Sequence, residues 1–158
     1  MDERYLIVEK LVKEYKLDKN VVGIYIFGSL AKGKINEKSD IDIEIIFNKR
    51  NKNYQLIHKQ IKGIKIDLSL YKEKQFIDDF SKKPYLQYAS LNYKIIYDPK
   101  KILEKNLTYI KNYFKEHPEI KKFWRKKEKK WKEAKKQGNK GTIENYFDII
   151  KELEKRMK

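Results

Sequence analysis

The sequence has no cysteine, and this absence excludes three kinds of chemistry. The chain can form no disulfide bond, bind no metal through thiolates and use no cysteine as a nucleophile. Histidine is scarce as well, with two residues in 158. His58 and His117 lie at no spacing to each other or to the carboxylates that is typical of a metal site or a catalytic triad. We therefore interpret each as an ordinary surface or interface histidine.

Long hydrophobic runs are also missing. No apolar run approaches the ~20 residues that a membrane-spanning helix needs. The first ten residues, MDERYLIVEK, are too acidic and too poor in apolar side chains for a signal peptide. We therefore expect a cytoplasmic protein with no membrane partner. The chain has 158 residues, of which 40% are hydrophobic, and this is enough for one domain with a substantial core.

Positive charge is abundant and unevenly distributed, with a formal net charge of +16. Residues 1–79 carry 16 basic and 13 acidic side chains, whereas residues 80–158 carry 23 and 10. The most basic stretch is 121–136, which contains ten Lys or Arg and only two Glu, interleaved with Trp124 and Trp131. Three interpretations stay open. The stretch binds nucleic acid such as RNA, docks a partner protein, or is a solvated helix face.

The clearest pattern in the chain lies in residues 21–47. Residues 21–27 are rich in β-branched and aromatic side chains and end at a glycine, which predicts a buried strand. Gly28 permits backbone dihedrals that other residues resist and lets a ligand approach the main chain closely. Ser29 adds a hydroxyl and a backbone N–H, and both suit phosphate oxygens.

A second strand is predicted over residues 40–47. Its side chains alternate, which places Asp40, Asp42 and Glu44 on one face and isoleucines on the other. Two carboxylates two residues apart on a strand can hold a hard divalent cation such as Mg²⁺ against the phosphates of a substrate. Residues 63–71 alternate in the same way and place Asp67 on the polar side of a further strand.

Gly28-Ser29, ten intervening residues and Asp40-Ile41-Asp42 form a pattern that resembles the polymerase-beta-like nucleotidyltransferase superfamily. The pattern is most similar to the minimal nucleotidyltransferases (MNT), including the antitoxins of HEPN/MNT toxin–antitoxin pairs. Lys32 stands where many members carry arginine. The resemblance implies an α/β (α+β) fold, in which a nucleotidyltransferase core of mixed sheet flanked by helices precedes a helical C-terminal tail. The core is expected over residues 1–98 and the tail over 99–158.

The same resemblance implies the roles of the site residues. Asp40 and Asp42 would bind two Mg²⁺ ions, and Asp67 would complete the metal site as the third carboxylate. Gly28 and Ser29 would hold the β- and γ-phosphates of ATP, and Lys32 would add positive charge at this nucleotide-binding site. Without the resemblance, Asp67 is simply a solvated residue on the polar face of a strand. Glu44 lies further along its strand and is not expected to be a ligand.

The acceptor of the transferred nucleotide follows from the resemblance alone. The antitoxin-like group suggests AMP transfer to a tyrosine of a partner HEPN toxin. The sequence contains no HEPN-type Arg-x(4–6)-His, which agrees with a toxin on a separate chain. The alternatives are a nucleotidyltransferase that acts on RNA or a small molecule, and a module that binds toxin or nucleic acid without catalysis.

Helical periodicity and turn residues complete the expected element order. Asp98-Pro99 is interpreted as a turn and helix cap and not as a catalytic pair. A break at 138–141 with Thr142 as a cap precedes the last helix. A further strand is expected over 91–97, and helices over 3–15, 30–32, 54–62, 73–80, 100–114, 116–137 and 143–157.

Overall fold

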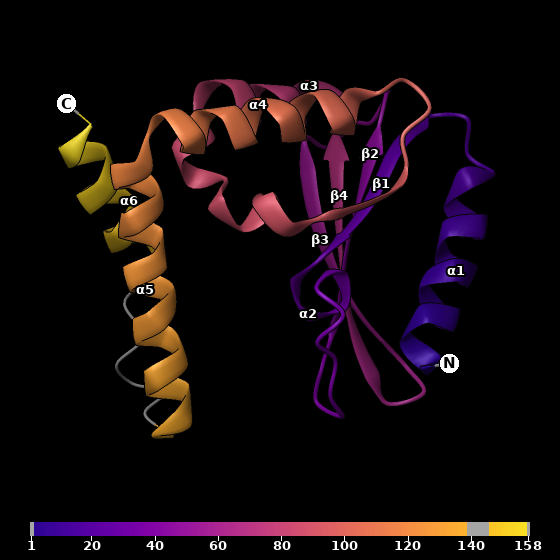
Figure 1. The fold of residues 1–158 in the computed structure, drawn as a ribbon. Helices are drawn as coiled ribbons and strands as arrows, with labels where there is room; N and C mark the ends of the chain where they lie inside the picture. The colour runs from indigo at the N-terminus through magenta and orange to yellow at the C-terminus, as the bar shows by residue number, and fades with distance from the viewer. Residues whose placement is uncertain (1, 139–145, 158) are drawn as a thin grey trace. The chain divides into compact units, whose positions relative to one another are not determined.

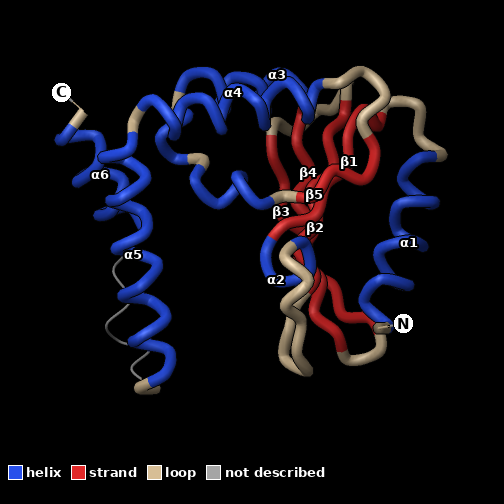
Figure 2. The backbone as a smooth tube through the Cα atoms, viewed as in Figure 1, coloured by secondary structure: helices blue, strands red, loops and turns tan. Residues whose placement is uncertain are grey.

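The computed structural model describes residues 2–138 and 146–157, which fall into two compact units, Met1–Tyr113 and Phe114–Lys158. The expected division at residue 98 stays a prediction. The first unit contains one five-stranded sheet in the order β3-β4-β2-β1-β5 (Figures 1 and 2). Its strands are β1 (Val21–Phe27), β2 (Ile41–Phe47), β3 (Tyr54–Ile61), β4 (Ile64–Lys72) and β5 (Lys94–Tyr97).

The sheet is mixed, as the family resemblance implies. β1 pairs antiparallel with β2 and β5, β3 pairs antiparallel with β4, and β2 pairs parallel with β4. The parallel pair puts Asp42 directly across from Asp67. The strand that follows β2 in the chain, β3, is therefore an edge strand, and β4 lies between β3 and β2.

The two faces of the sheet differ in character. Helix α1 (Glu3–Lys16) packs Ile7, Val8 and Leu11 against an aliphatic face, and Figure 1 shows it alongside the strands. The aliphatic side chains of this face are Ile24, Ile26, Ile41, Ile43, Ile45, Ile66, Leu68 and Leu70. The opposite face carries the predicted site residues and an aromatic cluster, in which Tyr25 lies 4.3 Å from Tyr93 and 6.1 Å from Phe76 between ring centroids.

Two helices supply side chains to this second face. Helix α3 (Glu73–Lys82) contributes Phe76 and Phe80, whose ring centroids lie 4.4 Å apart. Helix α4 (Ile102–Glu116) brings Leu103 against Gly23, where an added Cβ would meet the leucine at 3.2 Å. Asp98 accepts hydrogen bonds from the backbone N–H groups of Leu103 and Glu104 at 3.0 and 2.9 Å, so it acts as the predicted helix cap.

One prediction of secondary structure is wrong. A helix is predicted over residues 54–62, but Tyr54–Ile61 form strand β3. The cause is the turn that follows, because Lys62 and Gly63 both take positive φ, 50° and 78°, and reverse the chain into β4. Two such residues in succession make the tight turn of a β-hairpin, which pairs β3 with β4 along its whole length. Pairing therefore overrides the partial helical periodicity of this segment.

Smaller differences concern element ends. Strand β5 begins three residues after the predicted start at 91, because residues Tyr88–Asn92 form a short 3₁₀ helix. A short helix, α2 (Gly28–Ala31), begins directly at the glycine. The proposed break at 138–141 and the cap at Thr142 fall largely outside the described residues.

The second unit contains helices α5 (Pro118–Lys136) and α6 (Tyr146–Arg156). Phe123 and Trp124 of α5 are buried, as are Ile149 and Leu153 of α6. Trp124 is only 5% exposed and packs edge-on against Phe123, so its ring is not available to stack on a base. Among the described residues, no helix is long and apolar enough to cross a membrane.

Candidate active site

The predicted site is built on three neighbouring strands, β1, β2 and β4. Asp42 lies opposite Phe27 in the β1–β2 pairing and opposite Asp67 in the β2–β4 pairing. The residue after Phe27 is Gly28, so the Gly-Ser turn and two of the three carboxylates converge at one place on the polar face. The sequence separated these groups by up to 39 positions, and the strand register brings them together.

Gly28 touches the carboxylate of Asp42 closely. Its φ is +72°, a left-handed conformation that favours glycine. A Cβ added at this position would lie 2.8 Å from Oδ2 of Asp42, which is closer than real Cβ contacts. Glycine is therefore required here for two reasons, the backbone conformation and the space that the carboxylate fills.

The carboxylates interact electrostatically. Desolvation is the largest cause that raises the pKa of Asp42, and with the negative charges of Asp67 and Asp40, against a smaller opposing effect of Lys65, it brings this pKa to about 6. Such crowding of carboxylates is typical of sites that bind a cation or transfer protons. The structure thus brings Asp40, Asp42 and Asp67 within electrostatic reach of one another.

Asp40 lies just before β2, and an arginine holds the loop that delivers it. Arg4 of α1 is 8% exposed, and its guanidinium donates to the carbonyl oxygens of Ser39 at 2.8 Å and Glu37 at 3.0 Å. Asp2 pairs with the same guanidinium at 3.1 Å. A planar fork of donors suits two neighbouring carbonyls, which a lysine could not satisfy in the same way. This contact was not predicted from the sequence, where Arg4 is simply a charged residue in the first turn of a helix.

His58 is a second residue that the sequence did not single out. In the β3–β4 pairing it lies across from Asp67, and its Nδ1 is 2.6 Å from Oδ1 of Asp67. The side chain of His58 is 61% exposed, as expected of a surface histidine, but it also contacts one of the carboxylates, which its spacing in the sequence did not indicate. The Lys62-Gly63 turn was the signal that could have shown this, because a two-residue hairpin turn fixes the register.

Glu44 points to the same face as Asp42 but lies deeper. It is half-buried and accepts a hydrogen bond from the Tyr25 hydroxyl. Burial raises the pKa of Glu44 to about 8, so this carboxyl is largely protonated at neutral pH. A protonated, hydrogen-bonded acid is a poor metal ligand, which agrees with the expectation that Glu44 is not one.

The residues predicted to hold phosphates, Ser29 and Lys32, have fewer contacts with the rest of the site. Ser29 is half-buried in α2, where its carbonyl accepts from the N–H of Lys34 at 3.0 Å. Lys32 follows α2 and is exposed. Within the part of the chain that the structure describes, Lys32 forms no ion pair with the three aspartates. The predicted roles of Ser29 and Lys32 in holding phosphates stay predictions.

The donor set fits a divalent cation by its chemistry. Three crowded carboxylates present oxygen atoms, which are the preferred ligands of Mg²⁺. Within residues 2–138 and 146–157, no three acidic or histidine side chains are close enough to form a ready-made metal cage. His58 engages one oxygen of Asp67, which leaves the other oxygen to a ligand.

Comparison with known proteins agrees with this geometry. Residues 9–107 match the model of the family described as "Polymerase beta, Nucleotidyltransferase". The match extends from α1 through all five strands into α4, and the chain therefore belongs to this nucleotidyltransferase family. Family membership supports a transferase whose general reaction is nucleotidyl transfer, and members generally use nucleoside triphosphates and divalent metal ions.

A solved structure shows the same fold. The nucleotidyltransferase-like protein from Exiguobacterium sibiricum 255-15 superposes with a TM-score of 0.50 at 14% sequence identity. The match covers 90% of this chain and 50% of that one, so this chain spans about half the length of its structural relative. A search of curated proteins found no match.

Proposed function

We propose that this chain is an MNT-type antitoxin that transfers AMP from ATP to a tyrosine hydroxyl of a partner HEPN toxin, with Mg²⁺ as the metal. The contact between Gly28 and Asp42 carries this proposal. It unites the two halves of the Gly-Ser and Asp-x-Asp pattern, and the β2–β4 register adds Asp67 at the same point. Such a convergence of carboxylates has no use in a protein that works by contact alone.

The reaction forms one bond and breaks another. The acceptor hydroxyl oxygen attacks the α-phosphorus of ATP in line with the leaving group. The bond between the α-phosphorus and the oxygen that bridges to the β-phosphate then breaks, and pyrophosphate departs. The hydroxyl proton passes to the carboxylate of Asp67 or to water. The product is a phosphodiester between AMP and the acceptor.

Each site residue has a distinct part in this reaction. Asp40, Asp42 and Asp67 would hold the divalent ions, which supply positive charge to the triphosphate and lower the pKa of the acceptor hydroxyl. Gly28 and Ser29 would bind the β- and γ-phosphates through their backbone, and Lys32 would add charge from the exposed end of α2. Arg4 holds the main chain at Ser39 and so orients Asp40.

A different acceptor is the second candidate. The ten Lys or Arg in residues 121–136 would suit an RNA acceptor better than a small molecule, because phosphate contacts dominate binding to nucleic acids. The toxin acceptor is preferred because the spacing of the motif resembles the antitoxin group. The gene for an HEPN toxin should then lie next to the gene for this chain.

The test uses ATP labelled on its α-phosphate, with Mg²⁺ and the purified protein. The neighbouring gene product and bulk cellular RNA are offered as acceptors in separate reactions, and Asp40→Ala/Asp42→Ala is the control. Label on the neighbouring protein that is absent with the control variant supports the proposal. Label on RNA supports the second candidate. No label anywhere, together with tight binding of the control variant to the neighbouring protein, refutes catalysis.

A further inference from the structure

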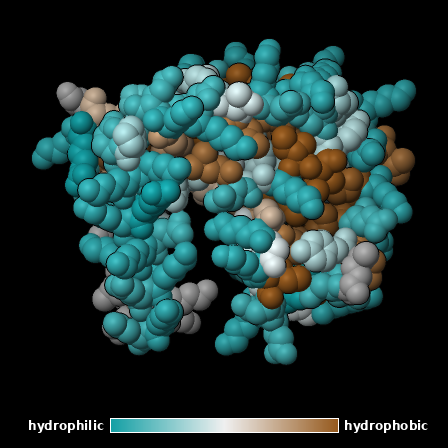
Figure 3. Space-filling model, viewed as in Figure 1, coloured by the Kyte–Doolittle hydropathy of each residue, from teal (hydrophilic) through white to brown (hydrophobic). Residues whose placement is uncertain are grey.

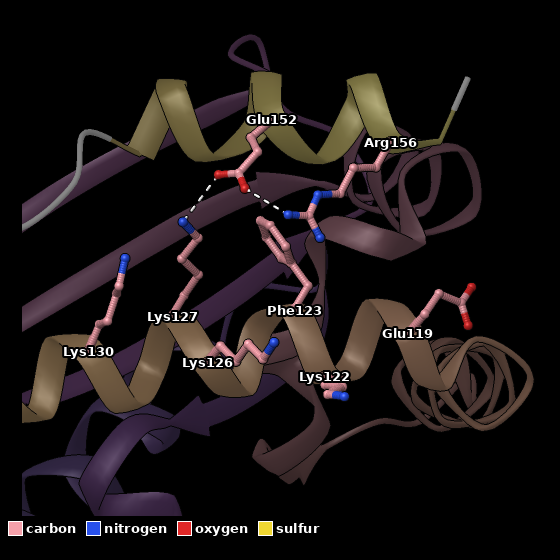
Figure 4. A pocket seen from close by; sticks show the side chains of 8 residues that line it. All are labelled: Glu119, Lys122, Phe123, Lys126, Lys127, Lys130, Glu152 and Arg156. Carbon is pink, nitrogen blue, oxygen red and sulfur yellow. Dashed lines mark hydrogen bonds and ion pairs between the residues drawn. The ribbon is translucent and has the colours of Figure 1, made fainter.

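A pocket in the second unit has no role in nucleotidyl transfer. It lies between α5 and α6, has a volume of about 330 Å³ and is lined by eight residues, all within the second unit (Figure 4). Five of the eight side chains are basic, and Glu119 and Glu152 are the acidic ones. The lining therefore carries a net charge of +3, in a recess that concentrates the field of its charges.

One carboxylate organises the side of the pocket that α6 contributes. Glu152 accepts from Lys127 through Oε2 and from Arg156 through Oε1, both at 3.1 Å. Figure 4 shows Lys127 reaching from α5 to this carboxylate. The two cations also lie over the ring of Phe123, at 5.4 and 5.1 Å from its centroid. These contacts fix the floor of the pocket and neutralise part of its charge.

Two lysines of α5 remain without such neutralisation. Lys122 and Lys126 are exposed, and within the described residues neither has an acidic partner. They lie four residues apart on one face of the helix, where the rise of 1.5 Å per residue separates their Cα atoms by about 6 Å along the axis. Lys130 continues the same row. A row of this kind matches the repeat of phosphates along an extended polynucleotide strand.

The pocket has no hydrophobic anchor to offer a protein. Its one apolar residue, Phe123, is 6% exposed and already covered by two cations. Figure 3 shows hydrophilic side chains over α5 on the face in view. Binding energy at protein interfaces comes mainly from buried aromatic and apolar anchors, whereas binding to nucleic acid comes mainly from charge. The composition of the pocket therefore favours a polyanionic strand over a folded protein.

We propose that the α5–α6 pocket binds the phosphodiester backbone of a single-stranded nucleic acid through Lys122 and Lys126. The site does not depend on the transfer reaction proposed above. Because the contacts are to phosphates, RNA and DNA strands of the same length bind with similar affinity. Trp124 and Trp131 do not line this pocket.

The experiment compares two double variants of the full chain. Lys122→Gln/Lys126→Gln removes two charges from the pocket. Arg125→Gln/Lys129→Gln removes two exposed charges with the same spacing from the same helix, outside the pocket. Binding of fluorescein-labelled 12-nucleotide poly(U) RNA and poly(T) DNA is followed by fluorescence anisotropy at several salt concentrations, without ATP or Mg²⁺. Circular dichroism checks that both variants are folded.

Each phosphate contact on a single strand contributes about 0.7 to the slope of log K against log salt. The pocket variant should therefore lose about 1.4 from this slope and bind roughly 25-fold more weakly at 0.1 M salt. The control variant should lose less than about 3-fold. Equal losses in the two variants would show general electrostatic attraction and overturn the site, as would no binding by the wild type.

Two further measurements test the ligand class of the pocket and its independence from the transfer reaction. A 12-residue polyglutamate that displaces the RNA at equal concentration would overturn the assignment to nucleic acid, because an acidic peptide would then fit as well. Asp40→Ala/Asp42→Ala should bind RNA as the wild type does. A normal affinity in that variant, whatever its transferase activity, shows that the pocket and the proposed reaction succeed or fail separately.

Discussion

Replacing Gly28 by alanine tests whether the Gly-Ser turn and the Asp-x-Asp strand form one site. Gly63 provides a matched control, because its φ is +78° against +72° at Gly28 and an added Cβ there meets nothing within 4 Å. Both substitutions force alanine into a left-handed conformation, which costs about 1–2 kcal/mol. Only Gly28→Ala also drives a methyl group to 2.8 Å from Oδ2 of Asp42.

The difference between the two variants follows from that contact. Asp42 has to leave its rotamer, which adds on the order of 1 kcal/mol to the destabilisation. Both variants should therefore unfold at lower urea concentration than the wild type, and Gly28→Ala should be somewhat less stable than Gly63→Ala. The two variants should differ strongly in their affinity for a divalent ion. Displacing a carboxylate that holds the ion should cost about 10- to 100-fold, the range that supporting residues of metal sites show, and Gly63→Ala should bind as the wild type does.

The assay is a calorimetric titration with Mg²⁺ and with Mn²⁺, alongside urea denaturation of all three proteins. The denaturation curves separate loss of fold from loss of the site. Equal ion affinity in the two variants, or wild-type affinity in Gly28→Ala, would show that the position of the Asp42 carboxylate does not require glycine at residue 28.

Three further predictions concern single residues. The pKa of Glu44 is about 8 in the folded protein against 4.5 in the unfolded chain, so the folded state binds this proton more tightly and the wild type loses stability as pH rises from about 4.5 to 8. Glu44→Gln should remove this loss, which is at most about 1.4 kcal/mol per pH unit. Urea denaturation in EDTA between pH 5 and 8 measures the free energy of unfolding of both proteins, and the same pH dependence in the wild type and the variant would contradict the prediction. Asp98→Ala should lower the free energy of unfolding by about 1 kcal/mol without changing transferase activity, and Asp98→Asn should lower it less. Arg4→Lys should lower the free energy of unfolding by about 2 kcal/mol and weaken divalent-ion binding, because one ammonium cannot hold both carbonyls that precede Asp40. Unchanged ion binding would show that Arg4 serves stability alone.

Local patterns predicted most of the first unit. The runs that became β1, β2 and β4 alternate or are continuously apolar, and both signals depend only on neighbours in the chain. The Gly-Ser and Asp-x-Asp residues were found because their spacing is a motif. β3 was missed because its apolar side chains follow neither period clearly, and its strand character comes from pairing with β4.

The missed functional contacts share one physical cause. The contact of His58 with Asp67 depends on the register of a hairpin, and the contact of Arg4 with Ser39 joins residues 35 positions apart. Sequence periodicity reports which face a residue takes, but not which residue lies opposite. The raised pKa of Asp42 likewise arises from desolvation and from charges on two segments, so no local pattern predicts it.

The place of β4 in the sheet has a consequence for folding. β4 pairs with β3 on one edge and with β2 on the other, and the hairpin partner precedes it directly in the chain. The β3–β4 hairpin is local and closes over two residues, whereas the parallel register with β2 joins residues 25 apart, so loop-closure entropy favours the hairpin first. Docking of that hairpin on β2 is then the step that brings Asp67 beside Asp42. The repulsion between these carboxylates opposes docking, and any cation that relieves it stabilises the finished sheet. A divalent ion would therefore slow unfolding of the first unit, because its binding at the metal site would stabilise the parallel pairing of β4 with β2.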